Sequence, residues 1–264
     1  MKLKLIAAAI GLVVSTASHA DIVPTTTTGG SDLLLDVWEQ GAPGGQPDQS
    51  FTLNLNETFT QFVNNANSSA TLATLLSTDS TWTNFLASSD TTDAGALQWS
   101  VIASGSRVPT TRPAILGTAT VGTDPTTQGA AGFLTNNDIL AANSQVSPTI
   151  AALNQSSTPN EQVALNGSGA YYQNFTLSNF NQHGFSNGNN LGTTAAVWTA
   201  SNTGAGTAAA TMAQLAGTMT FSQVGQNYVL SYNVAAVPEA PGLEMTLAGA
   251  ALLGFVALRR RRNA

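Results

Sequence analysis

The sequence contains no cysteine and only two histidines among its 264 residues. The absence of cysteine excludes a disulfide framework, a thiolate metal site and a cysteine nucleophile, so the fold must rest on its core and its hydrogen bonds. A zinc site needs several histidine or cysteine ligands. The sequence therefore predicts no metal ligand and no cofactor.

Positive charge is also scarce, because eight lysines and arginines stand against 14 aspartates and glutamates. Six of the eight basic residues lie close to the two ends of the chain, which leaves two basic and twelve acidic residues in 21–236. The net charge of this middle section is thus −10. An acidic surface repels phosphate backbones, so nucleic acid is excluded as a partner.

The N-terminus has the layout of a secretory signal peptide. Lys2 and Lys4 precede an apolar stretch at residues 5–14, and small side chains lead up to Ala20. An apolar stretch of this length is too short to remain as a membrane span. We therefore expect signal peptidase to cut between Ala20 and Asp21 and the rest of the chain to be exported.

Near the other end of the chain lies an apolar segment at residues 243–258. Its 16 residues would form a helix of about 24 Å, against about 30 Å for the hydrocarbon core of a membrane. With Glu244 at one interface and snorkelling arginines at the other, this helix can still span the inner membrane. The positive-inside rule places the basic cluster in the cytoplasm and the preceding residues outside it. This stop-transfer cluster consists of Arg259, Arg260, Arg261 and Arg262.

A short motif precedes the apolar segment, with Val237, Pro238 and Glu239 followed after Ala240 by Pro241. Motif, apolar helix and arginines together resemble the PEP-CTERM sorting signal of Gram-negative bacteria, although the second proline comes one residue later than in its commonest form. The resemblance covers the tail and the signal peptide that accompanies it. It implies a precursor anchored in the inner membrane, processing near the motif by a membrane enzyme called an exosortase, and a final location at the cell surface or in the extracellular matrix. It also implies association with exopolysaccharide.

Between the two ends, threonine, serine and asparagine favour strands and turns over long helices. Short apolar or alternating stretches separated by turn-forming residues predict a mainly β chain, arranged as a single β-sandwich-like domain at residues 21–236. Residues 217–222 and 228–234 predict a closing hairpin. With the signal peptide at 1–20 and the sorting tail at 237–264, this gives three parts. The other expected strands lie at 33–39, 51–55, 97–103, 114–121 and 171–180.

Short helical insertions are expected within this domain. Asn56 is a candidate cap for a helix through Phe62, and Ser80 for a second helix through Leu86. Residues 136–155 predict a third helix, broken or kinked near Pro148 because proline removes a backbone hydrogen bond.

Candidate catalytic groups are few. His183 is the only histidine in 21–236, and no Gly-x-Ser-x-Gly turn accompanies it. Glycoside hydrolysis needs only two carboxylates. Asp36 with Glu39 and Asp90 with Asp93 are candidate pairs, but solvated strand ends and loops commonly carry acids at such positions. The sequence therefore predicts no catalytic residue.

Two groups of residues are candidates for binding polysaccharide. Arg107 and Arg112 share one loop and could bind a carboxylate of an acidic polysaccharide, or pair with local acids instead. Four tryptophans could stack on sugar rings, but three of them lie in apolar strand patterns, where burial is the expected outcome. These three are Trp38, Trp99 and Trp198, and the fourth is Trp82.

We therefore expect an exported, non-enzymatic protein of the cell surface or extracellular matrix, sorted through its tail. Three alternatives remain open. The first is a secreted hydrolase that acts on polysaccharide through a carboxylate pair. The second is a module that binds carbohydrate or ice, and the third is a periplasmic protein that stays anchored in the inner membrane because the altered motif is not processed.

Overall fold

The computed structural model describes residues 30–39, 49–89, 97–107, 112–126, 134–158, 160–172, 188–201, 204 and 206–235. The chain divides into one compact unit that ends at Asn233 and a second from Val234 to Ala264. Apart from Val234 and Ala235, the second unit lies outside the described residues. The strands are β1 (Asp32–Glu39), β2 (Gln49–Thr58), β3 (Ala70–Leu75), β4 (Leu97–Arg107), β5 (Arg112–Thr120), β6 (Glu161–Leu165), β7 (Asn189–Asn190), β8 (Thr194–Ser201), β9 (Thr211–Val224) and β10 (Asn227–Val234), and the helices are α1 (Phe59–Asn65), α2 (Ser80–Ser88) and α3 (Asn136–Gln155).

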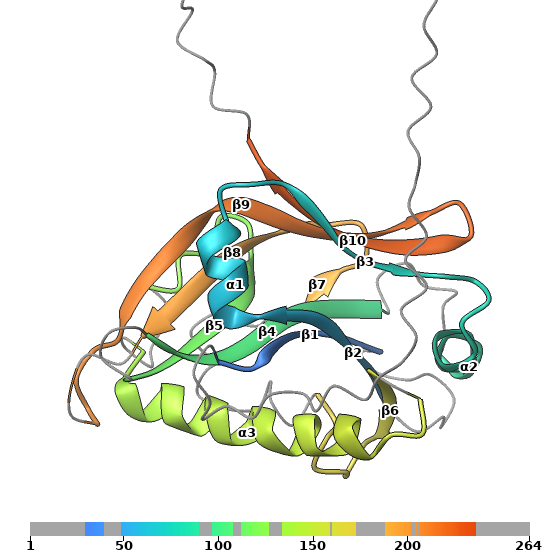
Figure 1. Cartoon of the computed structure of the whole chain (residues 1–264), viewed down its shortest axis with the longest axis horizontal. Helices are drawn as coiled ribbons and strands as arrows, with labels where there is room; N and C mark the ends of the chain where they lie inside the picture. Colours follow the sequence, from blue (N-terminus) through green and yellow to red (C-terminus); the bar gives the residue numbers. More distant parts are fainter. Residues whose placement is uncertain are drawn as a thin grey trace, which may run out of the picture. The chain divides into compact units, whose positions relative to one another are not determined.

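The prediction of a mainly β chain with helical insertions is confirmed. The strands form one hydrogen-bonded sheet in the order β3-β10-β9-β8-β5-β4-β1-β2-β6, and β7 pairs with β4 beside this path. Figure 1 shows how the sheet curls, so that β9, β10 and β3 lie above β4, β1 and β2 in that view. One continuous curled sheet thus takes the place of the two stacked sheets of the expected sandwich.

Aromatic side chains fill the space that the curled sheet encloses. Trp82 on α2 packs against Phe51 on β2 at 4.9 Å between ring centroids and against Tyr228 on β10 at 5.0 Å. Trp99 on β4 lies 6.3 Å from Phe221 on β9. Because these contacts connect β2 and β4 with β9 and β10, which stand apart in the strand order, they hold the sheet in its curled form.

Tyr232 on β10 joins the curled sheet to α1. Its hydroxyl donates to the Ala66 carbonyl at 2.7 Å and accepts from the Gly217 amide at 2.8 Å. The ring packs edge-on against Phe62 at 5.0 Å. Residue 217 must be glycine for this arrangement, because a Cβ atom there would lie 2.4 Å from the Tyr232 ring.

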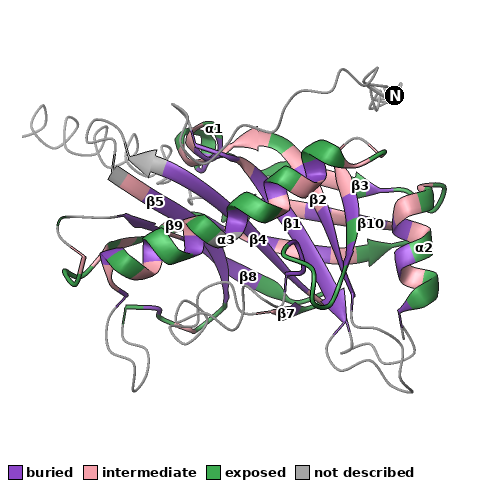
Figure 2. Ribbon diagram, turned by 90° about the horizontal axis from the view of Figure 1, so that it is seen from below, coloured by how far each residue is buried: buried purple, intermediate pink, exposed green. Residues whose placement is uncertain are grey.

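Helix α3 covers the outer face of the sheet (Figure 2). Its buried residues recur at spacings of three, four and seven, which places them on one side of a helix. They pack against side chains on the outer face of the sheet. Along each strand these outer-face residues alternate with inner-face residues, because successive side chains of a strand point to opposite faces. This outer core includes Leu34, Trp38, Ile102, Ile115 and Ala196 from the sheet and Ile139, Val146, Ile150 and Leu153 from α3.

The helix caps differ from those expected. Thr58 caps α1 and forms a capping box with Gln61, whereas Asn56 belongs to β2 with φ 55°. Asp79 caps α2, one residue before the expected Ser80, because its carboxylate accepts from two backbone amides of the first turn. The predicted caps are therefore wrong by one or two residues, although both helices are present.

Helix α3 runs from Asn136 to Gln155 with Pro148 inside it, so the expected break is absent. Val146 and Ile150 flank the proline and are both buried against the sheet. This packing holds the helix together across the hydrogen bond that proline cannot make. Among the described residues, no helix is long and apolar enough to cross a membrane.

Most of the expected strands are present. The stretches 33–39, 51–55, 97–103 and 114–121 fall within or extend one residue past β1, β2, β4 and β5, and the closing hairpin is formed by β9 and β10. The expected strand at 171–180 falls almost entirely outside the described residues.

Candidate functional site

The residues expected to direct sorting lie outside the described part of the chain. This applies to the signal cleavage site, to the Pro-Glu motif, to the apolar segment 243–258 and to the terminal arginines. His183, Asp90 and Asp93 also lie outside it. Arg107 and Arg112 are backbone partners at the end of the β4-β5 pair.

The four tryptophans do not offer a surface for sugar stacking. Trp38, Trp82 and Trp99 are at most 2% exposed, and Trp198 is 9% exposed. The burial predicted for the three strand tryptophans is confirmed. Any carbohydrate contact made by the described residues must therefore use other side chains.

Asp36 and Glu39 are not the solvated acids that the sequence suggested. Both are 1% exposed, because β1 lies between β4 and β2 and is covered on both faces. They are three residues apart on one strand, so their side chains point to opposite faces of the sheet. A glycosidase needs both carboxyl groups beside one bond. The two residues therefore do not form a catalytic pair.

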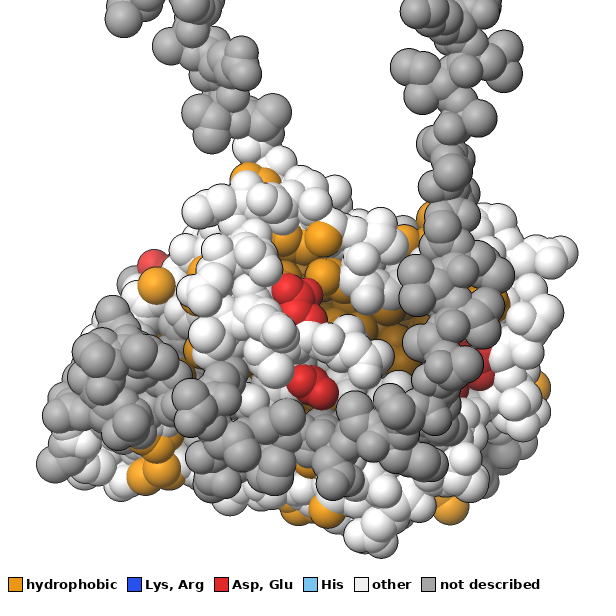
Figure 3. Space-filling view, viewed as in Figure 1, with side chains coloured by type: hydrophobic (Ala, Val, Ile, Leu, Met, Phe, Trp, Pro, Cys, Tyr) orange, Lys and Arg blue, Asp and Glu red, His pale blue; other side chains and the backbone are white. Residues whose placement is uncertain are grey.

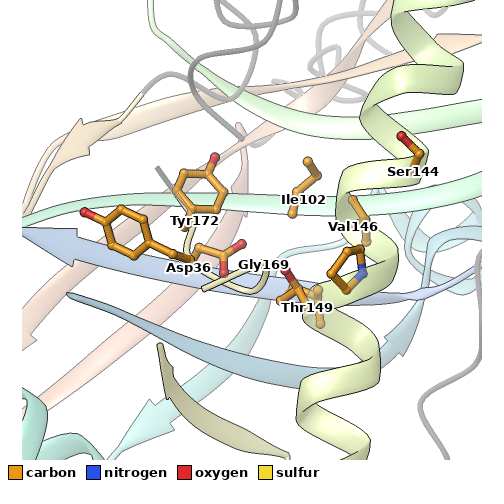
Figure 4. A pocket seen from close by; sticks show the side chains of 10 residues that line it. Asp36, Ile102, Ser144, Val146, Thr149, Gly169 and Tyr172 are labelled. Carbon is orange, nitrogen blue, oxygen red and sulfur yellow. The ribbon is translucent and has the colours of Figure 1, made fainter. Parts of the chain in front are cut away.

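Asp36 faces a cavity of about 220 Å³ between the sheet and α3 (Figure 4). Leu34 and Ile102 belong to the floor, which β1 and β4 supply. Helix α3 and the segment after β6 form the rest of the lining. Those remaining lining residues are Ser144, Val146, Pro148, Thr149, Gly169, Tyr171 and Tyr172.

The aromatic part of this lining is held in place by the sheet. Trp38, two residues after Asp36 on the same face of β1, packs against Tyr172 with 4.3 Å between the ring centroids and 34° between the ring planes. The Tyr172 amide donates to Ser50 Oγ of β2 at 3.1 Å. The segment that carries Tyr171 and Tyr172 is thus attached to β1 and β2 beside the carboxyl group.

The Asp36 carboxyl group is poorly compensated for a buried acid. Thr52, its cross-strand neighbour, donates a hydrogen bond from Oγ1 at 2.6 Å, the one hydrogen bond made by this side chain among the described residues. Burial raises the pKa of Asp36 from 3.8 to about 7, and the Thr52 hydrogen bond only partly opposes that rise. Near neutral pH the group is therefore divided between its acid and its carboxylate forms.

A second acidic site joins α2 to β6. Asp79 accepts hydrogen bonds from the Thr81 and Trp82 amides at 2.9 and 3.1 Å through one oxygen, as the cap of α2. Glu161 is half-buried beside it, and burial, a hydrogen bond with Asp79 and the charge of Asp79 raise the pKa of Glu161 to about 8.

The raised pKa favours the protonated form of Glu161 at neutral pH. Its Oε2 atom is buried and has no hydrogen-bond partner among the described residues, so a negative charge on this oxygen would be poorly compensated. Beside the pair lies a polar pocket of about 510 Å³. Its lining includes Ser80, Thr81, Asn84, Ser156, Ser157, Thr158 and Gln162.

Replacing Glu161 with glutamine is expected to increase stability near pH 8 by about 1 to 2 kcal/mol, after allowance for the solvent around a half-buried group. The folded-state pKa of Glu161 lies above its ordinary value of 4.5. Its contribution to stability is therefore fully present below 4.5 and is lost as the pH rises through about 8. Urea denaturation of both proteins between pH 4 and 9 measures this. The gain should vanish near pH 4, and a gain that is the same at every pH would contradict it.

Cationic groups do not balance these acids within the described side chains, which include no lysine, arginine or histidine. Figure 3 accordingly shows acidic side chains but no cationic ones among the coloured atoms of that face. No group of three or more His, Cys, Asp or Glu residues able to hold a metal ion occurs in the described part of the chain.

Comparison with family models, with curated proteins and with solved structures finds no match to this chain. The buried site at Asp36 and the half-buried pair of Asp79 and Glu161 therefore rest on the geometry alone. Local sequence patterns indicate neither site. The sequence suggests Asp36 only as a solvated acid or as a partner of Glu39 in a carboxylate pair, and nothing around Asp79 or Glu161 indicates that α2 and β6 bring them together.

Proposed function

We propose that this chain is an exported, non-enzymatic protein of the bacterial cell surface or extracellular matrix, associated with exopolysaccharide and sorted through its C-terminal tail. The observation that carries the proposal is the three-part tail, in which Pro238 and Glu239 precede the apolar segment 243–258 and four arginines. Its resemblance to the PEP-CTERM signal supplies the destination and the polysaccharide connection.

The proposed sorting has three steps. The signal peptide starts export, and the helix at 243–258 stops it with the arginines in the cytoplasm. The motif before the helix then lies at the outer side of the inner membrane, where an exosortase-like enzyme can cut. The mainly β body is compatible with this destination, because it is free of cysteine and its fold does not depend on disulfide formation after export.

Intact-mass measurement of the protein recovered from its own bacterium tests the sorting. We expect a mass that lacks the first 20 residues and the residues after the processing motif. In a Glu239→Gln variant, which loses the acidic group of the motif, we expect precursor with the complete tail to accumulate in the membrane fraction. A wild-type protein that keeps its arginine tail would contradict sorting and would favour the permanently anchored alternative.

The pair of Asp79 and Glu161 favours one second candidate, a polysaccharide hydrolase. The raised pKa of Glu161, which lines the polar pocket, suits the general acid that cleavage of a glycosidic bond requires. The polar pocket beside them offers hydroxyl and amide groups to a sugar. Release of reducing ends from the host's polysaccharide, lost in Glu161→Gln and kept in Asp124→Asn, would support the hydrolase. No release by the wild type would exclude it for that polysaccharide.

A further inference from the structure

We propose that the cavity beside Asp36, enclosed by β1, β4, α3 and Tyr171–Tyr172, binds a small ligand through a primary ammonium group. The inference concerns the folded body alone and goes beyond the sorting proposed above. Its test is therefore independent of whether the tail is processed.

The first step is that the cavity contains one buried acid with unused acceptor capacity. A carboxylate offers about four lone-pair sites. Within the described residues, Thr52 Oγ1 occupies one of them, at 2.6 Å. No other described residue donates to the remaining sites, and the side chain lines a space of about 220 Å³ that can hold a further donor.

The second step is that the described part of the chain provides no cation for this acid. The carboxyl and hydroxyl groups that line the cavity come from Asp36, Ser144, Thr149, Tyr171 and Tyr172, and none of these side chains is cationic. Asp36 pairs with Ser100 in the sheet, and Arg107 lies seven residues further along the same strand. At about 3.3 Å per residue this separation is roughly 23 Å, too long for an ion pair.

The third step is that the other walls suit the carbon skeleton and the charge of an amine. Leu34, Ile102, Val146 and Pro148 offer apolar contacts to a short alkyl chain or a ring. Tyr172, held by its packing against Trp38, brings an aromatic ring to the same space. The faces of such rings attract ammonium groups.

A neutral ligand fits this set of groups less well. A hydroxyl group can donate one hydrogen bond to the carboxyl group but leaves its charge uncompensated, and burying an uncompensated charge is costly. An ammonium group donates three hydrogen bonds and neutralises the charge. The cavity therefore selects the cation over the isosteric alcohol.

Isothermal titration calorimetry of the full-length chain with n-butylamine and with 1-butanol tests the proposal. Near pH 8 we expect n-butylamine to bind with a dissociation constant of about 1 mM and at least about tenfold more tightly than 1-butanol. Titrations with glucosamine and with glucose then show whether the ammonium is also accepted on a sugar ring. Preference for glucosamine alone would identify an amino sugar as the source, and preference for n-butylamine alone an alkyl amine.

The pH provides a readout that needs no variant. The ammonium of an alkylamine stays protonated well above pH 8, whereas Asp36 has a pKa of about 7 and loses its charge on acidification. The other titratable groups within the described lining are the phenols of Tyr171 and Tyr172. Binding of n-butylamine should thus weaken about 30-fold between pH 8 and pH 5.5.

Variants complete the test. Asp36→Asn keeps the size of the side chain and should weaken n-butylamine binding at least about tenfold. Asp124→Asn removes the same charge from an exposed turn and should leave binding unchanged. Equal affinity for the amine and the alcohol, amine binding by Asp36→Asn as tight as by the wild type, or no binding at tens of millimolar would overturn the proposal.

Discussion

Replacing Trp82 with alanine is expected to lower the free energy of unfolding by about 4 kcal/mol. The side chain is 1% exposed and lies where the two ends of the curled sheet approach each other. Its ring centroid is 4.9 Å from Phe51 on β2, 5.0 Å from Tyr228 on β10 and 6.1 Å from Phe221 on β9. Alanine would leave a cavity that these rings, fixed by three different strands, cannot close.

Urea denaturation of the full-length chain measures this loss, and two variants separate its causes. Trp82→Phe keeps a ring and removes a buried indole N–H that has no acceptor among the described residues, so its cost should be smaller, about 1 kcal/mol. Asn84→Ala alters an exposed position of the same helix and should be near neutral. A loss below about 1 kcal/mol in Trp82→Ala would show that the aromatic contacts do not hold the curl.

Local sequence patterns were sufficient for the strands whose environment is local. The alternation at 51–55 predicts a strand within β2, and the apolar runs around a Gly-containing turn predict the hairpin of β9 and β10. These patterns depend on a period of two along one strand. The order of the strands in the sheet cannot be deduced from such local periodicity. The sheet places β1 between β4 and β2 and β8 between β5 and β9, and such pairings depend on contacts between distant parts of the chain.

The site around Asp36 was missed for the same reason. In LLLDVWE an acid among apolar residues looked like the end of a solvated strand, but the uninterrupted apolar run is also typical of a strand buried on both faces. Only the position of α3 decides between the two interpretations, since α3 covers the face that carries Asp36. A polar residue within such a run is a signal that could have drawn attention to the site.

The geometry at Asp36 also implies a cost, because the fold retains a carboxyl group where it is poorly solvated. Burial raises its pKa to about 7 from 3.8, so the folded protein binds this proton more tightly than the unfolded chain does. The contribution of the group to stability is fully present below 3.8 and falls as the pH rises through about 7. Above that pH the folded state must hold an ionised carboxylate with one hydrogen bond from Thr52.

Asp36→Asn is therefore expected to stabilise the protein near pH 8 by about 2 to 4 kcal/mol and to change its stability little near pH 3.5. Asparagine is isosteric, carries no charge and can still accept the Thr52 hydrogen bond through its amide oxygen. Urea denaturation at the two pH values measures the difference. Asp124→Asn is a control for which we expect the opposite sign. Hydrogen bonds from Thr126 lower the pKa of Asp124, so removal of this carboxylate should destabilise the protein near pH 8.

The combination of the two Asp36→Asn outcomes is more informative than either alone. If the carboxyl group served only the packing of the sheet against α3, Asp36→Asn would gain stability and would lose no binding activity. If the cavity binds an ammonium ligand, the same variant becomes more stable and loses amine binding. A buried group that lowers the stability of the ligand-free protein and is required for ligand binding is typical of a binding site. Destabilisation of Asp36→Asn near pH 8 would contradict this account, because it would show that the folded state already compensates the charge.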